Sequence, residues 1–210
     1  EKKGKKGMFK IAVLASGGGT DFQSIIDAVH SGYLKNCIID ILISDRPGVY
    51  VLERAKKNNI EYHVLNRKIY KSNISDEILK LLHNRVQLIV CAGWLSILKG
   101  DLISQFQNRM INIHPSLIPS FCGDGMYGIK VHEKVLEHGV KISGCTVHFV
   151  DEGTDSGPII FQKAVPVYFE DTPEELQQRV LKEEHKALPK VIKLISENKV
   201  IVEGKRVKIL

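Results

Sequence analysis

The chain has 210 residues, of which 43% are hydrophobic and 26% are charged, and its formal net charge is +6. These values are typical of a globular protein with a buried core, and they exclude a disordered chain. No apolar run reaches the roughly 18 residues that a membrane helix needs, so the sequence predicts no membrane segment.

The basic N-terminus contributes a large share of the positive net charge. Residues 1–7, EKKGKKG, hold four lysines and one glutamate, which is half of the net charge. No apolar segment with a cleavage site follows, so we expect a disordered or artificially added tail rather than a signal peptide. In the rest of the chain basic residues are spread among acids, which disfavours a nucleic-acid partner. A modest positive charge suits small anionic substrates equally well.

The cysteines and histidines show no metal-binding spacing. Cys37, Cys91, Cys122 and Cys145 are far apart and form no CxxC pair, and no HExxH motif is present. We therefore expect reduced, structural cysteines, no metal site and a cytoplasmic location.

The first half of the chain alternates strand and helix patterns. Apolar runs predict strands at residues 9–15, 38–44, 61–65, 88–93 and 109–114. Helical spacing predicts helices at residues 21–32, 49–58 and 75–84, the last with Ser75 as its N-cap. This order predicts a doubly wound, mostly parallel α/β sheet with helices on both faces. Ligands bind such sheets beyond the carboxyl ends of the strands.

The second half follows another pattern. Two long strand patterns, at residues 142–153 and 157–167, are separated by few residues and predict an antiparallel extension. A long helix should run from the N-cap Thr172 to about Glu197, with Glu175 completing a capping box. Residues 200–210 predict a C-terminal hairpin. Residues 8–210 should therefore form a single domain.

A glycine-rich loop, SGGGTD at residues 16–21, lies between the first strand and the first helix. Its backbone N–H groups and the helix N-terminus suit a phosphate. No GK[ST] follows, and Phe22 stands where a dinucleotide fingerprint has its third glycine, so a single phosphate fits better than a pyrophosphate. The alternative is a flexible turn without a ligand, which the charge of Asp21 favours.

The stretch MINIHPSLIP, residues 110–119, ends a strand with two polar side chains. Asn112 and His114 are two residues apart and so share one face of the strand, and Pro115 stops the sheet. An amide can donate to an oxyanion, and an imidazole can move a proton near neutral pH. The alternative is a strand-end cap and a hydrogen-bonded core histidine.

Two later segments could complete a site. Residues 148–158, HFVDEGTDSGP, end a strand in an acidic loop with Asp151, Glu152 and Asp155. A carboxylate of this loop facing His114 would raise the imidazole pKa and orient the ring; otherwise the loop is a solvated turn. Residues 115–128 form a long irregular stretch, which indicates either a lid or binding loop or a mobile surface segment.

Together these motifs resemble the phosphoribosylglycinamide formyltransferase family. The resemblance runs from Met8 to the last helix. NIHPSL at residues 112–117 and GCTVHFVDEGTDSGPII at residues 144–160 are its most specific parts, and SGGGTDFQSIID at residues 16–27 matches more loosely.

The resemblance implies transfer of a formyl group from 10-formyltetrahydrofolate to the amine of glycinamide ribonucleotide in purine biosynthesis. The transfer would pass through a tetrahedral intermediate and need no metal, in a monomer or homodimer. Residues 8–108 would be a mononucleotide-binding half and residues 109–210 a catalytic and folate-binding half. The implied catalytic residues are Asn112, His114 and Asp155. The implied phosphate and ribose contacts are Gly18, Gly19, Thr20, Asp21 and Glu184. The implied folate contacts are Leu95, Ser96, Ile97, Leu98, Asn112, Asp151 and Asp155.

Some positions depart from the family pattern. Asp21 stands where the family commonly has Asn, and Ser96 and Asn73 stand where it has arginines. The 115–128 loop is a few residues longer than in common members.

Three alternative functions stay open. A formyltetrahydrofolate hydrolase usually has an extra N-terminal domain and a histidine at the position of Pro115. A methionyl-tRNA formyltransferase usually has an extra C-terminal barrel. A catalytically silent nucleotide-binding module is the alternative outside enzymes.

Overall fold

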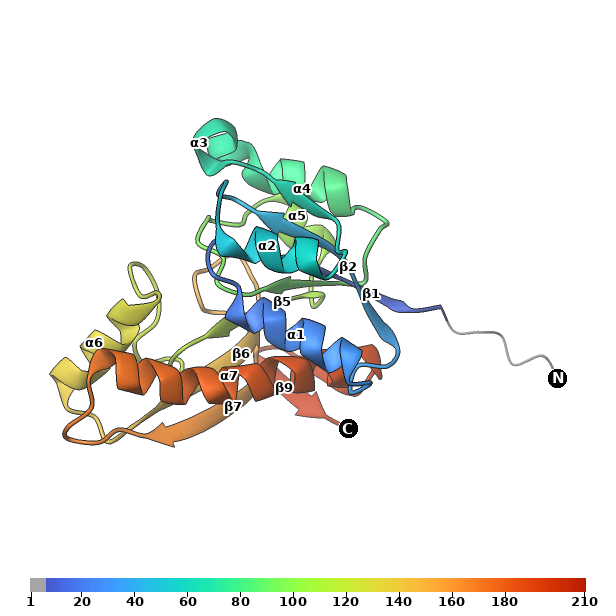
Figure 1. The fold of residues 1–210 in the computed structure, drawn as a ribbon. Coiled ribbons are helices and arrows are strands. Elements are labelled where there is room, and N and C mark those ends of the chain that lie inside the picture. Colours follow the sequence, from blue (N-terminus) through green and yellow to red (C-terminus); the bar gives the residue numbers. More distant parts are fainter. Residues whose placement is uncertain (1–6) are drawn as a thin grey trace.

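The computed structural model describes residues 7–210, so most of the expected tail, residues 1–6, lies outside the described residues. A central seven-stranded sheet has the strand order β3-β2-β1-β4-β5-β6-β7 (Figure 1). Its strands are β1 (Phe9–Leu14), β2 (Cys37–Ser44), β3 (Tyr62–Val64), β4 (Leu88–Cys91), β5 (Met110–His114), β6 (Ile142–Phe149) and β7 (Ile159–Pro166). Strands β1 to β5 are parallel, and β6 is antiparallel to both β5 and β7. The mostly parallel α/β fold and its antiparallel extension are as the sequence predicts.

Helices cover both faces of the sheet. They are α1 (Thr20–His30), α2 (Tyr50–Lys57), α3 (Arg67–Tyr70), the 3-10 turn η1 (Lys71–Asn73), α4 (Ile74–Leu82), α5 (Asp101–Gln105), α6 (Ile129–His138) and α7 (Pro173–Ser196). Alternate residues of β1 enter two different cores. Ile11 and Val13 pack in the core that holds α1, α2 and α7, while Ala12 and Leu14 pack in the core that holds α4 and α5. Successive side chains point to opposite faces, and both faces are buried, so the sequence of such a strand is apolar at every position.

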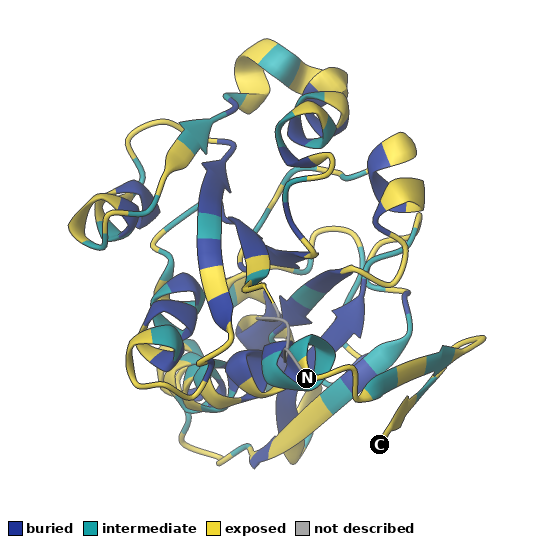
Figure 2. Cartoon of the chain, turned by 90° about the vertical axis from the view of Figure 1, so that its right-hand side faces the viewer, coloured by how far each residue is buried: buried dark blue, intermediate teal, exposed yellow. Residues whose placement is uncertain are grey.

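Helix α7 begins as the sequence predicts. The Thr172 hydroxyl accepts a hydrogen bond from the Glu175 N–H (3.2 Å), and the Glu175 carboxylate accepts one from the Thr172 N–H (2.9 Å). The predicted C-terminal hairpin is also present as β8 (Val200–Glu203) and β9 (Arg206–Ile209). In Figure 2 this hairpin projects from the body of the protein and is largely exposed or half-buried.

One predicted helix start is wrong. Helix α4 begins at Ile74, directly after η1, so Ser75 lies inside the helix rather than at its N-cap. The Ser75 hydroxyl is buried and accepts a hydrogen bond from the Lys99 N–H (3.0 Å). This tertiary partner, which the sequence pattern does not show, uses the hydroxyl. The patterns also do not predict α3 and α5, which are too short to show a helical period, or α6.

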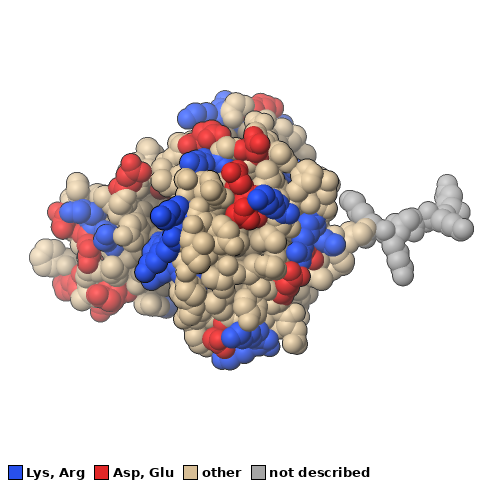
Figure 3. Space-filling view, turned by 90° about the horizontal axis from the view of Figure 1, so that it is seen from above, with Lys and Arg blue, Asp and Glu red and all other residues tan. Residues whose placement is uncertain are grey.

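The cysteines and the surface charges are arranged as in an ordinary globular protein. All four cysteines are free thiols, and only Cys122 is partly exposed. Figure 3 shows lysine, arginine and acidic side chains interspersed over one face of the molecule. No helix among residues 7–210 has both the length and the apolar character needed to cross a membrane.

Candidate active site

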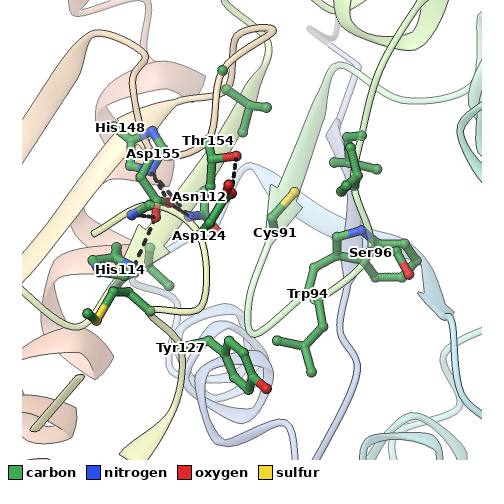
Figure 4. Close-up of a pocket in the computed structure, with 18 of the residues that line it drawn as sticks. Cys91, Trp94, Ser96, Asn112, His114, Asp124, Tyr127, His148, Thr154 and Asp155 are labelled. Atoms are coloured by element: carbon green, nitrogen blue, oxygen red, sulfur yellow. Dashed lines mark hydrogen bonds and ion pairs between the residues drawn. The ribbon is translucent and has the colours of Figure 1, made fainter. Parts of the chain in front are cut away.

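A cavity of about 370 Å³ opens over strands β5 and β6, on the face of the sheet that also carries α4 and α5 (Figure 4). It is within the size range of small-molecule sites. Its lining includes the segment after β4 (Gly93–Leu98), the end of β5 (Asn112–Pro115), the loop Gly123–Gly128 and the acidic loop Val150–Asp155. All seven of the residues expected to contact folate line it. The cavity therefore extends from the carboxyl ends of the parallel strands onto the face of the sheet formed by β5 and β6.

Asn112, His114 and Asp155 meet in this cavity. Asn112 and His114 project from the same face of β5, and Ile111 and Ile113 pack in the opposite core. The Asn112 amide nitrogen lies 3.5 Å from Asp155 Oδ1, and His114 Nδ1 lies 3.6 Å from Asp155 Oδ2. Figure 4 shows the three side chains turned toward one another. An amide donor, an imidazole and a carboxylate are thus available around one point.

His148 is a fourth polar member of this cluster, and the motif reading of the sequence assigns it no role. It pairs directly with Asn112 in the β5–β6 register. Its Nδ1 is 2.8 Å from the Phe149 carbonyl oxygen and must therefore donate a proton to it. Its Nε2 lies 3.2 Å from the Asn112 amide nitrogen and 3.6 Å from Asp155 Oδ1. His148 thereby orients the Asn112 amide. The register of β5 and β6, which residue spacing along the chain does not show, brings His148 next to Asn112.

The 115–128 loop folds against the same residues. His114 Nε2 donates to the Phe121 carbonyl oxygen (2.8 Å), and the Gly123 N–H donates to Asp155 Oδ2 (3.1 Å). The Ser116 hydroxyl closes the loop by donating to the Ser120 carbonyl oxygen (2.6 Å). Since the loop contacts both His114 and Asp155 and lines the cavity, its geometry is that of a binding loop.

The charge state of His114 differs from the expectation. Burial lowers the pKa of His114, and it outweighs the Phe121 carbonyl and the Asp155 carboxylate, which act in the opposite direction. Asp155 does act to raise the pKa of His114, as expected, but burial has the larger effect and the net shift is downward. For Asp155, burial acts to raise the pKa, but His148, His114 and the Gly123 N–H together lower it. The site thus combines a neutral imidazole with an ionised carboxylate at neutral pH.

His132 makes folding sensitive to mild acid. This residue of α6 is 1% exposed, its Nδ1 has no hydrogen-bond partner, and burial together with the charge of His114 lowers its pKa to about 4. Because the unfolded chain binds a proton near the ordinary value of about 6.5, the stability contributed by His132 is complete above that pH and falls as the pH drops toward 4. At pH 5 we expect the wild type to have lost about 2 kcal/mol relative to pH 8 from this residue.

Urea unfolding of the wild type and His132→Leu at both pH values measures this loss. The variant should lose about 2 kcal/mol less than the wild type between the two pH values. His30→Leu, at an exposed position on α1, serves as the control and should follow the wild type. Equal pH dependence of wild type and His132→Leu would contradict the prediction.

The glycine loop has the geometry of an anion cradle at the N-terminus of α1. Gly19 is the N-cap residue, with φ 78°, and a Cβ there would lie 2.5 Å from a Val51 methyl group. Only glycine satisfies both conditions. The Arg54 guanidinium lies beside the loop and donates to the Gly18 carbonyl oxygen (2.7 Å). Thr20 opens the helix, so its free N–H groups are available to a phosphate.

Asp21 and Glu184 lie near this cradle, between α1 and α7, close enough that each carboxyl shifts the pKa of the other. These two residues, together with Gly18, Gly19 and Thr20, do not line the cavity over β5. The structure thus places the expected phosphate and ribose contacts in one group and the expected catalytic and folate contacts in another.

The two other departures from the family pattern lie outside the reacting group. The Ser96 hydroxyl donates to the fully buried carboxylate of Asp45, and Asn73 is exposed at the end of η1. Neither supplies a positive charge at the cavity. Among residues 7–210, no three His, Cys, Asp or Glu side chains form a group that could hold a metal ion.

Known proteins with similar sequences and structures share one family. The family model for formyl transferases matches residues 9–192. Over 197 residues the chain is 39% identical to the chloroplastic phosphoribosylglycinamide formyltransferase of Arabidopsis thaliana, covering 91% of the chain and 66% of that protein. It is 40% identical over 194 residues to the human trifunctional purine biosynthetic protein adenosine-3, covering 91% of the chain and 19% of the relative. The chain thus spans only part of these curated relatives.

Two solved structures extend the comparison. Glycinamide ribonucleotide transformylase 1 from Symbiobacterium toebii superposes with a TM-score of 0.90 at 41% identity, covering 97% of this chain and 94% of that one. A formyltetrahydrofolate deformylase from Pseudomonas syringae pv. tomato superposes with a TM-score of 0.87 at 25% identity, covering 98% and 67%. Since the family model matches residues 9–192, most of the chain, this protein belongs to the formyl transferase family.

Proposed function

We propose that the chain transfers a formyl group from 10-formyltetrahydrofolate to the amine of glycinamide ribonucleotide, a step of purine biosynthesis. The observation that carries the proposal is the convergence of Asn112, His114 and Asp155 in one cavity. The similarity to transformylases named for this reaction supports the choice of substrate. A cytoplasmic location and a monomeric or homodimeric state stay predictions.

Each substrate has a place in this proposal. The formyl folate occupies the cavity, between Leu95–Leu98 and the acidic loop. Asp151 shapes that loop by accepting from the Gly153 N–H (3.0 Å) and the Ser156 hydroxyl (2.6 Å). The phosphate of the ribonucleotide sits at the N-terminus of α1. Residues 8–108 then supply the phosphate cradle and residues 109–210 the reacting groups, and the folate cavity draws on both halves.

The reacting groups act as follows. The amine nitrogen attacks the formyl carbon, a nitrogen–carbon bond forms, and the bond from that carbon to the folate nitrogen breaks. The Asn112 amide, oriented by His148, donates to the oxygen that becomes negative, which is worth about 3 kcal/mol in comparable sites. The neutral His114 accepts the proton released by the amine and returns it to the departing nitrogen, so no net proton is lost. Asp155 stabilises the intervening imidazolium.

A hydrolase is the runner-up, since a deformylase shares the fold. The chain is less similar to that deformylase, at 25% identity, than to the transformylase, at 41%. The residue after His114 is a proline, so it offers no second imidazole for activating water. A catalytically silent module would have no need of the complete polar group in the cavity.

The deciding experiment follows formyl loss from 10-formyltetrahydrofolate with and without glycinamide ribonucleotide. We expect loss only when the ribonucleotide is present, with formation of N-formylglycinamide ribonucleotide and tetrahydrofolate. Loss at the same rate in buffer alone would identify a hydrolase. Binding of both compounds without turnover would identify a silent module.

A further inference from the structure

Two carboxyl groups lie against each other at the start of α1. Asp21 is in the first turn of α1 and Glu184 is in the middle of α7, two helices that run side by side (Figure 1). Glu184 is 4% exposed and the Asp21 side chain is 13% exposed, and the two carboxyls lie close enough that each shifts the pKa of the other. Two buried carboxylates this close together repel each other, which favours a proton on one of them.

Among residues 7–210, no basic side chain neutralises the pair. His185 Nε2 is 3.6 Å from Asp21 Oδ1, too far for a hydrogen bond, and neither atom has another partner. Burial lowers the pKa of His185, so the ring is neutral at neutral pH. The Arg54 guanidinium donates to Gly18 and to Gln23 instead. Within residues 7–210, neither carboxyl forms an ion pair with a lysine or arginine.

The other titratable groups nearby add no positive charge. On β6, burial raises the pKa of the Cys145 thiol to about 12, so it stays neutral. On α7, Glu183 forms an ion pair with Lys186 (3.5 Å), which is therefore not directed at Asp21 or Glu184. On α1, Asp27 is exposed and accepts a hydrogen bond from Gln23. The surroundings therefore favour a pair that carries a single negative charge.

Building on the proposed function, we propose that Asp21 and Glu184 share one proton and that this proton is needed to bind the substrate's phosphate. The phosphate would sit at the N-terminus of α1, beside the first-turn residue Asp21. A second negative charge there would repel it. With the shared proton the pair carries one negative charge instead of two, which reduces its repulsion of the phosphate.

The ionisation of Asp21 and Glu184 determines how phosphate binding should change with pH. Burial raises the pKa of Asp21 to about 6, although Glu184 acts to lower it, and burial and the charge of Asp21 raise the pKa of Glu184. The pair titrates in two steps, and the second step removes the shared proton. As the pH rises through this second step, the pair becomes doubly negative and phosphate binding weakens. Binding in turn favours uptake of a proton.

Asp21→Asn tests the proposal because it keeps the shape and removes the ionisation. Calorimetric titration with glycinamide ribonucleotide would be run on the wild type and the variant from about pH 6 upward. The ligand's own phosphate ionises equally in both, so the ratio of the dissociation constants, wild type over variant, isolates the pair. We expect this ratio to rise by up to about tenfold per pH unit above the second step. Asp27→Asn, which removes a charge from the same helix, should follow the wild type.

A second measurement examines the free protein. In carbon-13 spectra with labelled aspartate and glutamate carboxyls, the wild type should show an aspartate resonance that titrates well above the range of exposed acids. This resonance should be absent from Asp21→Asn and present in Asp27→Asn. An ordinary titration of Asp21, or parallel binding profiles for wild type and Asp21→Asn, would overturn the proposal. If the ribonucleotide bound at no pH while the resonance behaved as expected, the shared proton would stand and the proposed function and phosphate role would fail.

Discussion

Replacing His114 by alanine should lower kcat for formyl transfer by about a hundredfold to a thousandfold, with a much smaller effect on the KM values. The imidazole sits 3.6 Å from Asp155 in the cavity, and in the proposed mechanism it acts only as the proton moves. Loss of one group that stabilises a transition state typically costs about 3 kcal/mol, which corresponds to this loss in rate. Steady-state kinetics with both substrates measures it.

The control is His30→Ala, at an exposed position on α1, which should leave kcat unchanged. Asp155→Asn should also reduce kcat, and the double variant His114→Ala/Asp155→Asn should be little slower than the slower single variant, because the two residues act as a unit. A kcat within about threefold of wild type for both single variants would rule out the assigned roles.

Gly157→Ala should be strongly destabilising, by at least about 3 kcal/mol. Gly157 follows the acidic loop and is buried, and a Cβ there would lie 1.8 Å from the Phe149 carbonyl oxygen and 2.8 Å from its carbon. Both are backbone atoms, so no side chain can rotate away. The backbone must shift where β6 gives way to the loop, and this shift would also displace Asp155. Chemical denaturation gives the free energy of unfolding, and kcat of the folded fraction reports on the site.

Gly17→Ala is the matched stability control, because a Cβ at this position would meet nothing within 4 Å and its φ is not left-handed. It should change the free energy of unfolding by less than about 0.5 kcal/mol. A loss of under about 1 kcal/mol for Gly157→Ala would show that the loop adapts easily, contrary to the prediction.

The strands and the helices α1, α2, α4 and α7 follow from the sequence because their signals are local, whereas α6 was not predicted. Apolar runs such as residues 9–15 can be buried on both faces of a sheet, and the capping box at Thr172 is complete within four residues. Ser75 shows the limit of such signals. It has the side chain of an N-cap but bonds to Lys99 in another segment, and the preceding turn moves the helix start to Ile74.

The candidate site also has features that the sequence determined and features that only the tertiary structure decided. The sequence by itself determined that Asn112 and His114 share a face, since side chains alternate along any strand, and that glycines open α1. Only the tertiary structure decided the rest. The β5–β6 register brought His148 opposite Asn112, and packing of α1 on α7 brought Asp21 against Glu184. Burial then lowered the pKa of His114 although Asp155 stands beside it. Distances between remote segments and the depth of burial set these effects, and neither is encoded in residue spacing along the chain.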